Sequence, residues 1–238
     1  MAEMLDALAV IFPFEIESYA DTDLPVEFVG HPFLSEGYEP WLHYDPEGPL
    51  LLLPGSRRIA VGRIFPVLLK AFAALRKEKP EQKSVVFYPD DSIRKILEGE
   101  LERWPELKGA VELREKESKS GARAVLTSSG TMSLSCALAG LPGVIAYRAN
   151  WFTYLIGRMI VKIPYLGICN LLLEKAMYPE YIQNLATPKA LLEELRECLD
   201  SPERLKNTQE DTEKLREILS ATGTSSIDGW LEKKLEEG

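Results

Sequence analysis

The chain has 238 residues, of which 45% are hydrophobic, so it can bury a sizeable core in one large domain or two small ones. Its formal net charge of −9 argues against a nucleic-acid partner held mainly by phosphate neutralisation. The chain has only two histidines, His31 and His43, which argues against a zinc site built on histidines. We expect no metal and no cofactor.

The first segments predict a strand, a short helix and a second strand. Leu8–Phe12 and Val26–Val29 are short apolar runs bounded by turn residues, which is typical of strands. Phe14–Tyr19 between them predicts a short helix or turn. Gly30–Pro49 is rich in glycine, proline and aromatic residues and predicts a linker. A secretory signal is absent, so we expect a cytoplasmic protein.

A unit of alternating strands and helices follows. The expected strands are Leu50–Leu53, Val85–Tyr88, Ala110–Leu113, Ala124–Leu126 and Gly143–Ala146. The expected helices are the segment from Ile64 to Leu75, Ile93–Trp104 and Met132–Ala139, and Lys116–Ala122 is expected to be a charged loop. This alternation predicts an α/β fold in which a Rossmann-like parallel sheet carries helices on both faces. In such sheets, ligands bind beyond the carboxyl ends of the strands.

The last third predicts solvated outer helices at Pro188–Leu199 and Pro202–Leu219, which are amphipathic and heavily charged. From Leu191 to Gly238 there are 13 acidic and 7 basic residues, a net charge of −6. Leu141–Ala190 instead has five basic and two acidic residues, a net charge of +3. A basic middle in an acidic chain indicates a local site for anions. The three cysteines, without metal-like spacing, are expected to be buried hydrophobes in a reducing compartment.

Two turns at strand ends are candidate anion sites. Ser128–Thr131 precedes a helix, so it directs backbone N–H groups and the positive end of the helix dipole at one point. Gly130 lets a ligand approach the backbone closely. The same residue types also make an ordinary helix cap. Pro54–Arg57 forms the second turn and supplies a guanidinium at the end of another strand.

The run Ala149–Ile168 has only two charges among its 20 residues, Arg158 and Lys162, and begins with the aromatic residues Trp151 and Phe152. A glycine, a proline and the charges interrupt it, which excludes a transmembrane helix. An aromatic and basic amphipathic helix suits a membrane interface or an acyl chain. A core helix between the sheet and the C-terminal helices is the alternative.

Seven pieces, taken in chain order, resemble lipid-A-disaccharide synthase, a glycosyltransferase of the two-domain GT-B architecture. They are Phe12–Glu15, Phe28–Pro32, Leu53–Arg57, Ser129–Thr131, Pro142 with Tyr147 and Arg148, Asn170–Leu172, and Glu180 with Gln183. That family transfers a diacylated glucosamine from UDP to a lipid-linked glucosamine phosphate, in lipid A biosynthesis, at the cytoplasmic face of the inner membrane. The resemblance implies a donor similar to UDP-diacylglucosamine.

The resemblance also assigns roles to individual residues. Contacts with the diphosphate of the UDP-sugar are implied for Gly55, Ser56, Arg57, Ser129, Gly130, Thr131 and Arg148. Contacts with the sugar or ribose are implied for Ser135, Asn170, Glu180 and Gln183. Fixed backbone dipoles and a guanidinium stabilise the charge that grows on a leaving diphosphate without reorganising.

Structural roles are open for three of these residues. The alternative for Arg57 is a surface arginine that caps a loop. The alternative for Arg148 is a structural ion pair with Glu180 or a C-terminal carboxylate. Glu180 follows Pro179, so a place at a helix start is equally consistent with the sequence.

The chain departs from the family pattern in two places. The family has a ribose-contacting glutamate four residues after the threonine of its Ser-Gly-Thr motif, and Ser135 stands there in this chain. We therefore expect weaker nucleotide binding. The Pro-Gly-Ser-Arg motif normally continues with an acidic residue, and here Arg58–Val61 follows.

The resemblance divides the chain into the end of a first GT-B domain (residues 1–33), a linker (34–49), a UDP-sugar-binding domain (50–188) and C-terminal helices (189–238). The catalytic residues are then expected in a first domain on a separate chain, which makes this chain half of a split enzyme, peripheral on the inner face of the inner membrane. The exposed strand edges of residues 1–33 invite such a partner. The alternatives are a non-catalytic nucleotide, lipid or membrane-surface binding protein, or another UDP-sugar enzyme of the same architecture.

Overall fold

The computed structural model describes residues 4–115, 118–128, 130–148, 165–220 and 227–237. Contacts within the chain define two compact units. Unit 1 consists of Met1–Pro40 and Glu213–Gly238, and unit 2 consists of Trp41–Thr212. Each unit is described below by itself.

The centre of unit 2 is a six-stranded parallel sheet with the strand order β10-β9-β8-β4-β5-β6. Its strands are β4 (Leu50–Leu53), β5 (Ser84–Tyr88), β6 (Val111–Glu115), β8 (Ala124–Thr127), β9 (Gly143–Tyr147) and β10 (Glu180–Ile182). β4 and β8 are central strands, paired from Leu50↔Ala124 to Leu53↔Thr127, and every residue of both is buried. Burial on both faces explains why they are continuous apolar runs.

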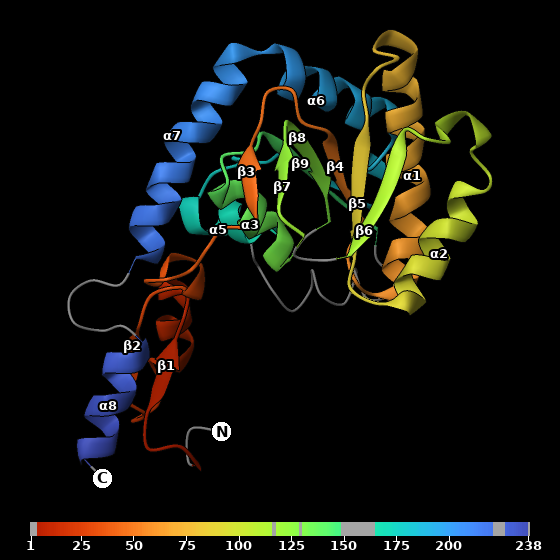
Figure 1. Ribbon diagram of the computed structural model, residues 1–238. Helices are drawn as coiled ribbons and strands as arrows, with labels where there is room; N and C mark the ends of the chain where they lie inside the picture. Colours follow the sequence, from red (N-terminus) through yellow and green to blue (C-terminus); the bar gives the residue numbers. More distant parts are fainter. Residues whose placement is uncertain (1–3, 116–117, 129, 149–164, 221–226, 238) are drawn as a thin grey trace. The chain divides into compact units, whose positions relative to one another are not determined.

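Helices cover both faces of this sheet (Figure 1). They are α1 (Arg58–Glu78), α2 (Asp91–Leu101), α3 (Thr131–Leu138), α5 (Ile168–Leu173), α6 (Pro188–Asp200) and α7 (Pro202–Leu219, which continues into unit 1). Helices α1, α2 and α6 pack together on one face, where Phe65, Leu68 and Phe72 are fully buried in the core. Helices α3 and α5 pack together on the other face. The predicted α/β fold with a parallel sheet is confirmed.

A second, two-stranded sheet in unit 2 contradicts two predictions. β3 (Leu42–Tyr44) pairs in parallel with β7 (Ser120–Ala122), although these segments were expected to be a linker and a charged loop. Each strand has three residues, and their pairing brings together segments far apart in the sequence. The two predictions used only the glycine, proline and charge content within each segment, and such local composition does not reveal a pairing between distant segments. Single-turn 3-10 helices lie at Pro105–Leu107 and Gln183–Leu185.

Unit 1 contains β1 (Leu8–Val10) and β2 (Val26–Phe28), which pair in parallel, and the 3-10 helix η2 (Pro13–Tyr19) between them. This arrangement confirms the predicted strand–helix–strand order. A further 3-10 helix, η3 (Pro32–Leu34), and the helix α8 (Ile227–Glu237) complete the unit. The His31 N–H donates to the carbonyl oxygen of Leu219 at 2.9 Å, which joins the chain after β2 to the end of α7.

The three cysteines are buried and free, as expected. Burial raises the pKa of the Cys169 and Cys198 thiols to about 12, so both stay neutral. A neutral, buried thiol behaves as a small hydrophobic side chain.

We expect His31 to make unit 1 sensitive to acid. The side chain is 5% exposed, and its Nδ1 accepts a hydrogen bond from the Phe33 N–H at 3.1 Å. Burial lowers the pKa of His31, so protonation favours the unfolded state. The stability contributed by neutral His31 is complete above the unfolded pKa of about 6.5 and is lost as the pH falls through the lower, folded value.

We therefore expect the urea midpoint of unfolding to drop between about pH 7.5 and about pH 5.5. His31→Asn is the matched variant, because asparagine offers a capping acceptor at this position but does not titrate. Its midpoint should fall less over the same interval. Equal acid sensitivity in both proteins would assign the effect to other groups.

Candidate functional site

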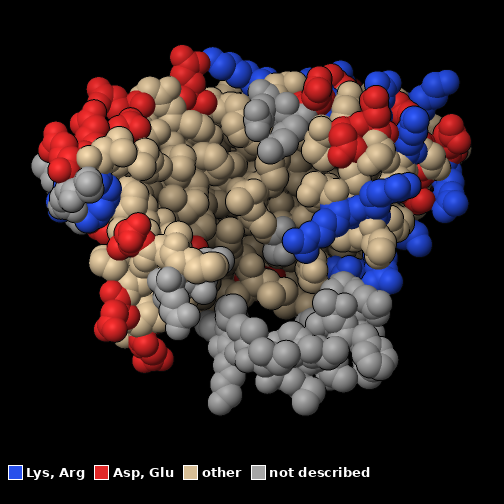
Figure 2. All heavy atoms as spheres, turned by 90° about the horizontal axis from the view of Figure 1, so that it is seen from below, with Lys and Arg blue, Asp and Glu red and all other residues tan. Residues whose placement is uncertain are grey.

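A cavity of about 440 Å³ lies at the carboxyl ends of β4, β5, β8 and β9. Figure 2 looks onto this edge of the sheet and shows basic side chains gathered on the side of α1 and α2. Arg57 is the one charged side chain among the described residues that line the cavity, and none of these residues is a carboxylate. The wall therefore suits an anion.

The first wall is the turn between β4 and α1. Gly55 has φ of 98°, and a Cβ added there would lie 2.8 Å from the Ser128 Oγ. The Ser128 N–H in turn donates to the Leu53 carbonyl oxygen at 2.8 Å. The two predicted turns therefore meet closely at one edge, and the positive φ favours glycine at position 55. Arg57 follows, exposed, directly before the first turn of α1.

The second wall is the start of α3. Gly130 is the N-cap residue, with φ of 130° and ψ of −172°, a conformation that only glycine adopts readily. It has no side chain to cap the helix, so the first amides of α3, at Thr131 and Met132, have no N-cap side-chain partner. Both residues line the cavity. A helix end with free N–H groups beside a cation is a natural anion site. Ser129 lies outside the described residues.

Ser135 lies one turn into α3 and does not line the cavity. Its side chain is buried, and its Oγ donates to the carbonyl oxygen of Thr131 at 3.3 Å. The hydroxyl is thus directed along its own helix.

Asn170 and Glu180 belong to a hydrogen-bond network that fixes α5 on β10. Asn170 is fully buried, donates to the Tyr178 carbonyl oxygen at 2.6 Å and accepts from the Tyr178 N–H at 2.9 Å. The Glu180 carboxylate accepts from the N–H groups of Leu166 and Gly167, each at 2.9 Å, and from Asn170 Nδ2 at 2.8 Å. Glu180 thereby caps the start of α5, and the structure gives both residues structural partners.

Arg148 and Gln183 follow β9 and β10 at adjacent positions, because Tyr147 pairs with Ile182 in the register. Arg148 Nη2 donates to the Ala186 carbonyl oxygen at 2.7 Å. The Arg148 Nε and the Gln183 Nε2 are buried without a hydrogen-bond partner, and Gln183 has a φ of 55°. Tyr147 lines the cavity, so Arg148 directly follows a residue of its wall, and Gln183 takes the matching position on the neighbouring strand.

Trp151, Phe152, Arg158 and Lys162, predicted to contact a membrane or lipid, lie outside the described residues. Within the parts of the chain that the structure describes, no helix is both long and apolar enough to cross a membrane. No cluster of three or more potential metal ligands occurs among the same residues.

Ser128, the first residue of the predicted turn Ser128–Thr131, lines the cavity as expected. Tyr88, Met132 and Tyr147 also line the cavity, and the sequence analysis assigned no ligand contact to them. Tyr88 and Tyr147 are the last residues of β5 and β9, so the rule that ligands bind beyond the carboxyl ends of parallel strands would have identified them.

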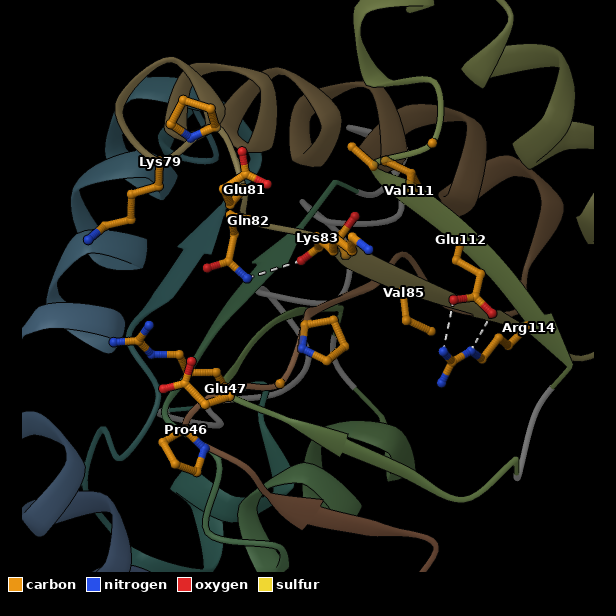
Figure 3. Close-up of a pocket in the computed structure, with 17 residues that line it drawn as sticks. Pro46, Glu47, Lys79, Glu81, Gln82, Lys83, Val85, Val111, Glu112 and Arg114 are labelled. Atoms are coloured by element: carbon orange, nitrogen blue, oxygen red, sulfur yellow. Dashed lines mark hydrogen bonds and ion pairs between the residues drawn. The ribbon is translucent and has the colours of Figure 1, made fainter.

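A larger cavity of about 930 Å³ lies at the opposite, amino ends of β4, β5 and β6 (Figure 3). Its lining carries both signs of charge, with the carboxylates Glu47, Glu81 and Glu112 and the basic residues Lys79, Lys83, Arg114 and Arg123. Glu112 pairs with Arg114, whose Nε lies 2.7 Å from its carboxylate. Ligands of open α/β sheets bind at the carboxyl ends, so we place the candidate site in the smaller cavity.

The chain is similar to known proteins over nearly its full length. The family model described as lipid-A-disaccharide synthetase matches residues 1–234. The lipid-A-disaccharide synthase of Geobacter metallireducens is 31% identical over 94% of this chain and 61% of its own length. That of Hahella chejuensis is 30% identical over 100% of this chain and 63% of its own length. The chain thus spans about three fifths of the curated relatives it matches.

Solved glycosyltransferase structures share the fold. The pneumococcal O-GlcNAc transferase GtfA, in complex with UDP and GlcNAc, has a TM-score of 0.56 and 15% identity, over 99% of this chain and 46% of that one. The glycotransferase of kitacinnamycin has a TM-score of 0.57 and 16% identity, over 97% of this chain and 55% of that one. At such identities, the likeness supports the GT-B type of α/β fold and no finer statement.

Proposed function

Because this chain belongs to the lipid-A-disaccharide synthetase family, we propose that unit 2 binds the diphosphate of a UDP-sugar in the cavity at the carboxyl ends of its sheet. The observation that carries this proposal is the meeting of two turns, at Gly55 and Gly130, beside uncapped helix amides and Arg57. These are the groups that bind a diphosphate, and no described carboxylate in the wall repels it.

The chemistry of these groups fits the departure of a nucleoside diphosphate. As the bond between sugar and diphosphate breaks, negative charge grows on the leaving oxygens. Thr131 and Met132 at the start of α3 and Arg57 before α1 line the cavity, so we propose that their amides and guanidinium stabilise this charge. The unsatisfied donor of Arg148 is a further proposed contact for the diphosphate, and that of Gln183 is the proposed contact for the sugar side of the same ligand.

The proposed reaction is the transfer of an acylated glucosamine from UDP to a lipid-linked glucosamine phosphate. We propose that a first GT-B domain, not contained in residues 1–238, supplies the acceptor site and the catalytic residues. The relatives are longer than the span matched here, which is the support for such a domain. Both proposed substrates are lipids, so we place the complex on the inner face of the inner membrane, with the aromatic and basic residues 149–168 towards the acyl chains.

Calorimetric titration of the chain with UDP and with UDP-N-acetylglucosamine tests the nucleotide site. Arg57→Ala removes a charge-assisted contact worth about 1.5–3 kcal/mol, so we expect the affinity for both ligands to fall roughly 10- to 100-fold. Arg58→Ala is the matched control, because Arg58 is equally exposed but does not line the cavity. It should change the affinity less than about threefold.

Wild-type protein that releases no heat with either ligand would overturn the assignment. If Arg57→Ala and Arg58→Ala lose affinity equally, the loss reflects surface charge in general and not a contact between Arg57 and the ligand.

A further inference from the structure

The groups that line the candidate cavity follow the order of the strands. The sheet order β9-β8-β4-β5 places the start of α3 and the turn at Gly55 after the two inner strands, β8 and β4. Tyr147 lines the cavity at the end of β9, and Tyr88 lines it at the end of β5. Neighbouring strands lie about 4.8 Å apart, so Tyr88 stands about one strand spacing from the Gly55 turn. A ligand whose diphosphate occupies the two inner turns can therefore extend to Tyr88.

The ring of Tyr88 is held by its own surroundings. Tyr88 is the last residue of β5, and α2 begins soon after it with the N-cap Asp90, whose side chain accepts hydrogen bonds from two amides of the first turn. The guanidinium of Arg94 lies over the ring, 5.8 Å from its centroid, and Arg94 Nε donates to Glu98 at 2.8 Å. A cation over an aromatic face is attracted to it. A ring fixed in this way loses little conformational entropy when a ligand binds.

Tyr88 presents an apolar ring to the cavity. The side chain is half-buried, and both Tyr88 and the following Pro89 line the cavity, whereas Arg94 does not. The guanidinium therefore holds the ring without occupying the cavity. Aromatic side chains bind nucleobases by stacking on their faces, and this contact accepts any base because every base has such a face. Tyr88 is thus suited to a planar group at the end of the ligand that lies beyond the diphosphate.

The ribose of a nucleotide has weaker contacts in this wall than the base. Ser135 is buried, and its Oγ donates to the carbonyl oxygen of Thr131 at 3.3 Å, away from the cavity. Among the described residues that line the cavity, no side chain is a carboxylate or a carboxamide. A carboxylate could accept hydrogen bonds from both ribose hydroxyls, whereas the hydroxyl side chains of this wall offer single contacts. The nucleoside is therefore held mainly through its base.

We propose that Tyr88 is the platform on which the nucleobase of the donor stacks while the diphosphate lies at the turns of Gly55 and Gly130. This inference rests on the proposed function for the class of ligand, and it adds the residue that recognises the base. The site then distinguishes a nucleoside diphosphate from a bare diphosphate by the stacked ring. It does not distinguish ribose from deoxyribose, because the described wall offers the ribose hydroxyls no paired acceptor.

Calorimetric titration of the chain with UDP and with inorganic pyrophosphate tests this platform. Tyr88→Leu removes the ring and keeps an apolar side chain at the end of β5. We expect its affinity for UDP to fall about 5- to 100-fold, as for the loss of one contact between a base and an aromatic ring. Its affinity for pyrophosphate should change less than about twofold, because pyrophosphate has no base. Tyr88→Phe keeps the ring and should bind UDP within about twofold of wild type.

Tyr44→Leu is the matched control for the loss of a tyrosine ring. Tyr44 is half-buried and ends β3 as Tyr88 ends β5, but it does not line the cavity. The variant should bind both ligands within about twofold of wild type, since Tyr44 has no part in the stacking contact. Titration of wild-type protein with deoxyuridine diphosphate tests the ribose, and we expect an affinity within about threefold of that for UDP.

Three results would overturn the platform and leave the diphosphate site standing. They are UDP binding by Tyr88→Leu as tight as by wild type, equal losses of UDP and pyrophosphate affinity in that variant, and a loss in Tyr88→Phe as large as in Tyr88→Leu. The second result would mean that Tyr88 supports the glycine turns and contacts no base. Deoxyuridine diphosphate bound at least about tenfold more weakly than UDP would overturn the statement on ribose. Wild-type protein that binds neither UDP nor pyrophosphate would instead overturn the proposed function, and the platform with it.

Discussion

Gly130→Ala is expected to weaken UDP binding by the chain at least about tenfold and to destabilise the fold by about 1–3 kcal/mol. The reason is backbone strain and not a clash. A Cβ added at Gly130 would meet no atom within 4 Å, but φ of 130° with ψ of −172° is a region that residues with a Cβ avoid. The variant must rotate this peptide, which turns the Thr131 amide away from the cavity.

Gly99→Ala is the matched control for this change. Gly99 lies within α2, has no positive φ, and an added Cβ would again meet nothing within 4 Å. Alanine should therefore stabilise the protein by up to about 1 kcal/mol and leave UDP affinity unchanged. The measurements are calorimetric titration with UDP and urea unfolding of both variants. If Gly130→Ala binds UDP as well as wild type does, the start of α3 is an ordinary helix end.

The sequence predicts the central strands well because their burial determines their composition. Leu50–Leu53 is predicted with the same bounds that β4 has, and Val85–Tyr88 differs from β5 by one residue. Because both faces of these strands are buried, their sequences are continuous apolar runs without polar residues, and such runs are easily recognised as strands. β10 was not predicted, because Glu180–Ile182 has three residues and no residue of it is fully buried.

Within the candidate site, the sequence predicts the positions of some residues and not the surroundings of others. The turns at Gly55 and Gly130 follow strand ends, so the parallel topology alone brings them to one edge. Arg57 lines that cavity as expected for a residue of the first turn. The surroundings of Asn170 were not predictable, because its partners are the N–H and carbonyl of Tyr178, and main-chain groups leave no mark in a sequence.

Asn170→Ala tests whether this side chain serves the fold or a ligand, and we expect a loss of about 2–5 kcal/mol in the free energy of unfolding. The change leaves the buried N–H and carbonyl of Tyr178 unpaired and removes one donor from Glu180. Each buried group left without a partner costs about 1–3 kcal/mol.

Tyr178→Phe calibrates this experiment, since it removes only the bond from the Tyr178 hydroxyl to the Leu141 carbonyl oxygen at 2.5 Å. It leaves a single carbonyl unpaired, so its cost should be about 1–2 kcal/mol, smaller than that of Asn170→Ala. Urea midpoints of both variants, with UDP-N-acetylglucosamine titrations of each, separate the two roles. A small loss of stability in Asn170→Ala with a tenfold or larger loss of sugar-nucleotide affinity would make Asn170 a ligand contact. The reverse result assigns it to the junction of α5 and β10, where its contacts lie.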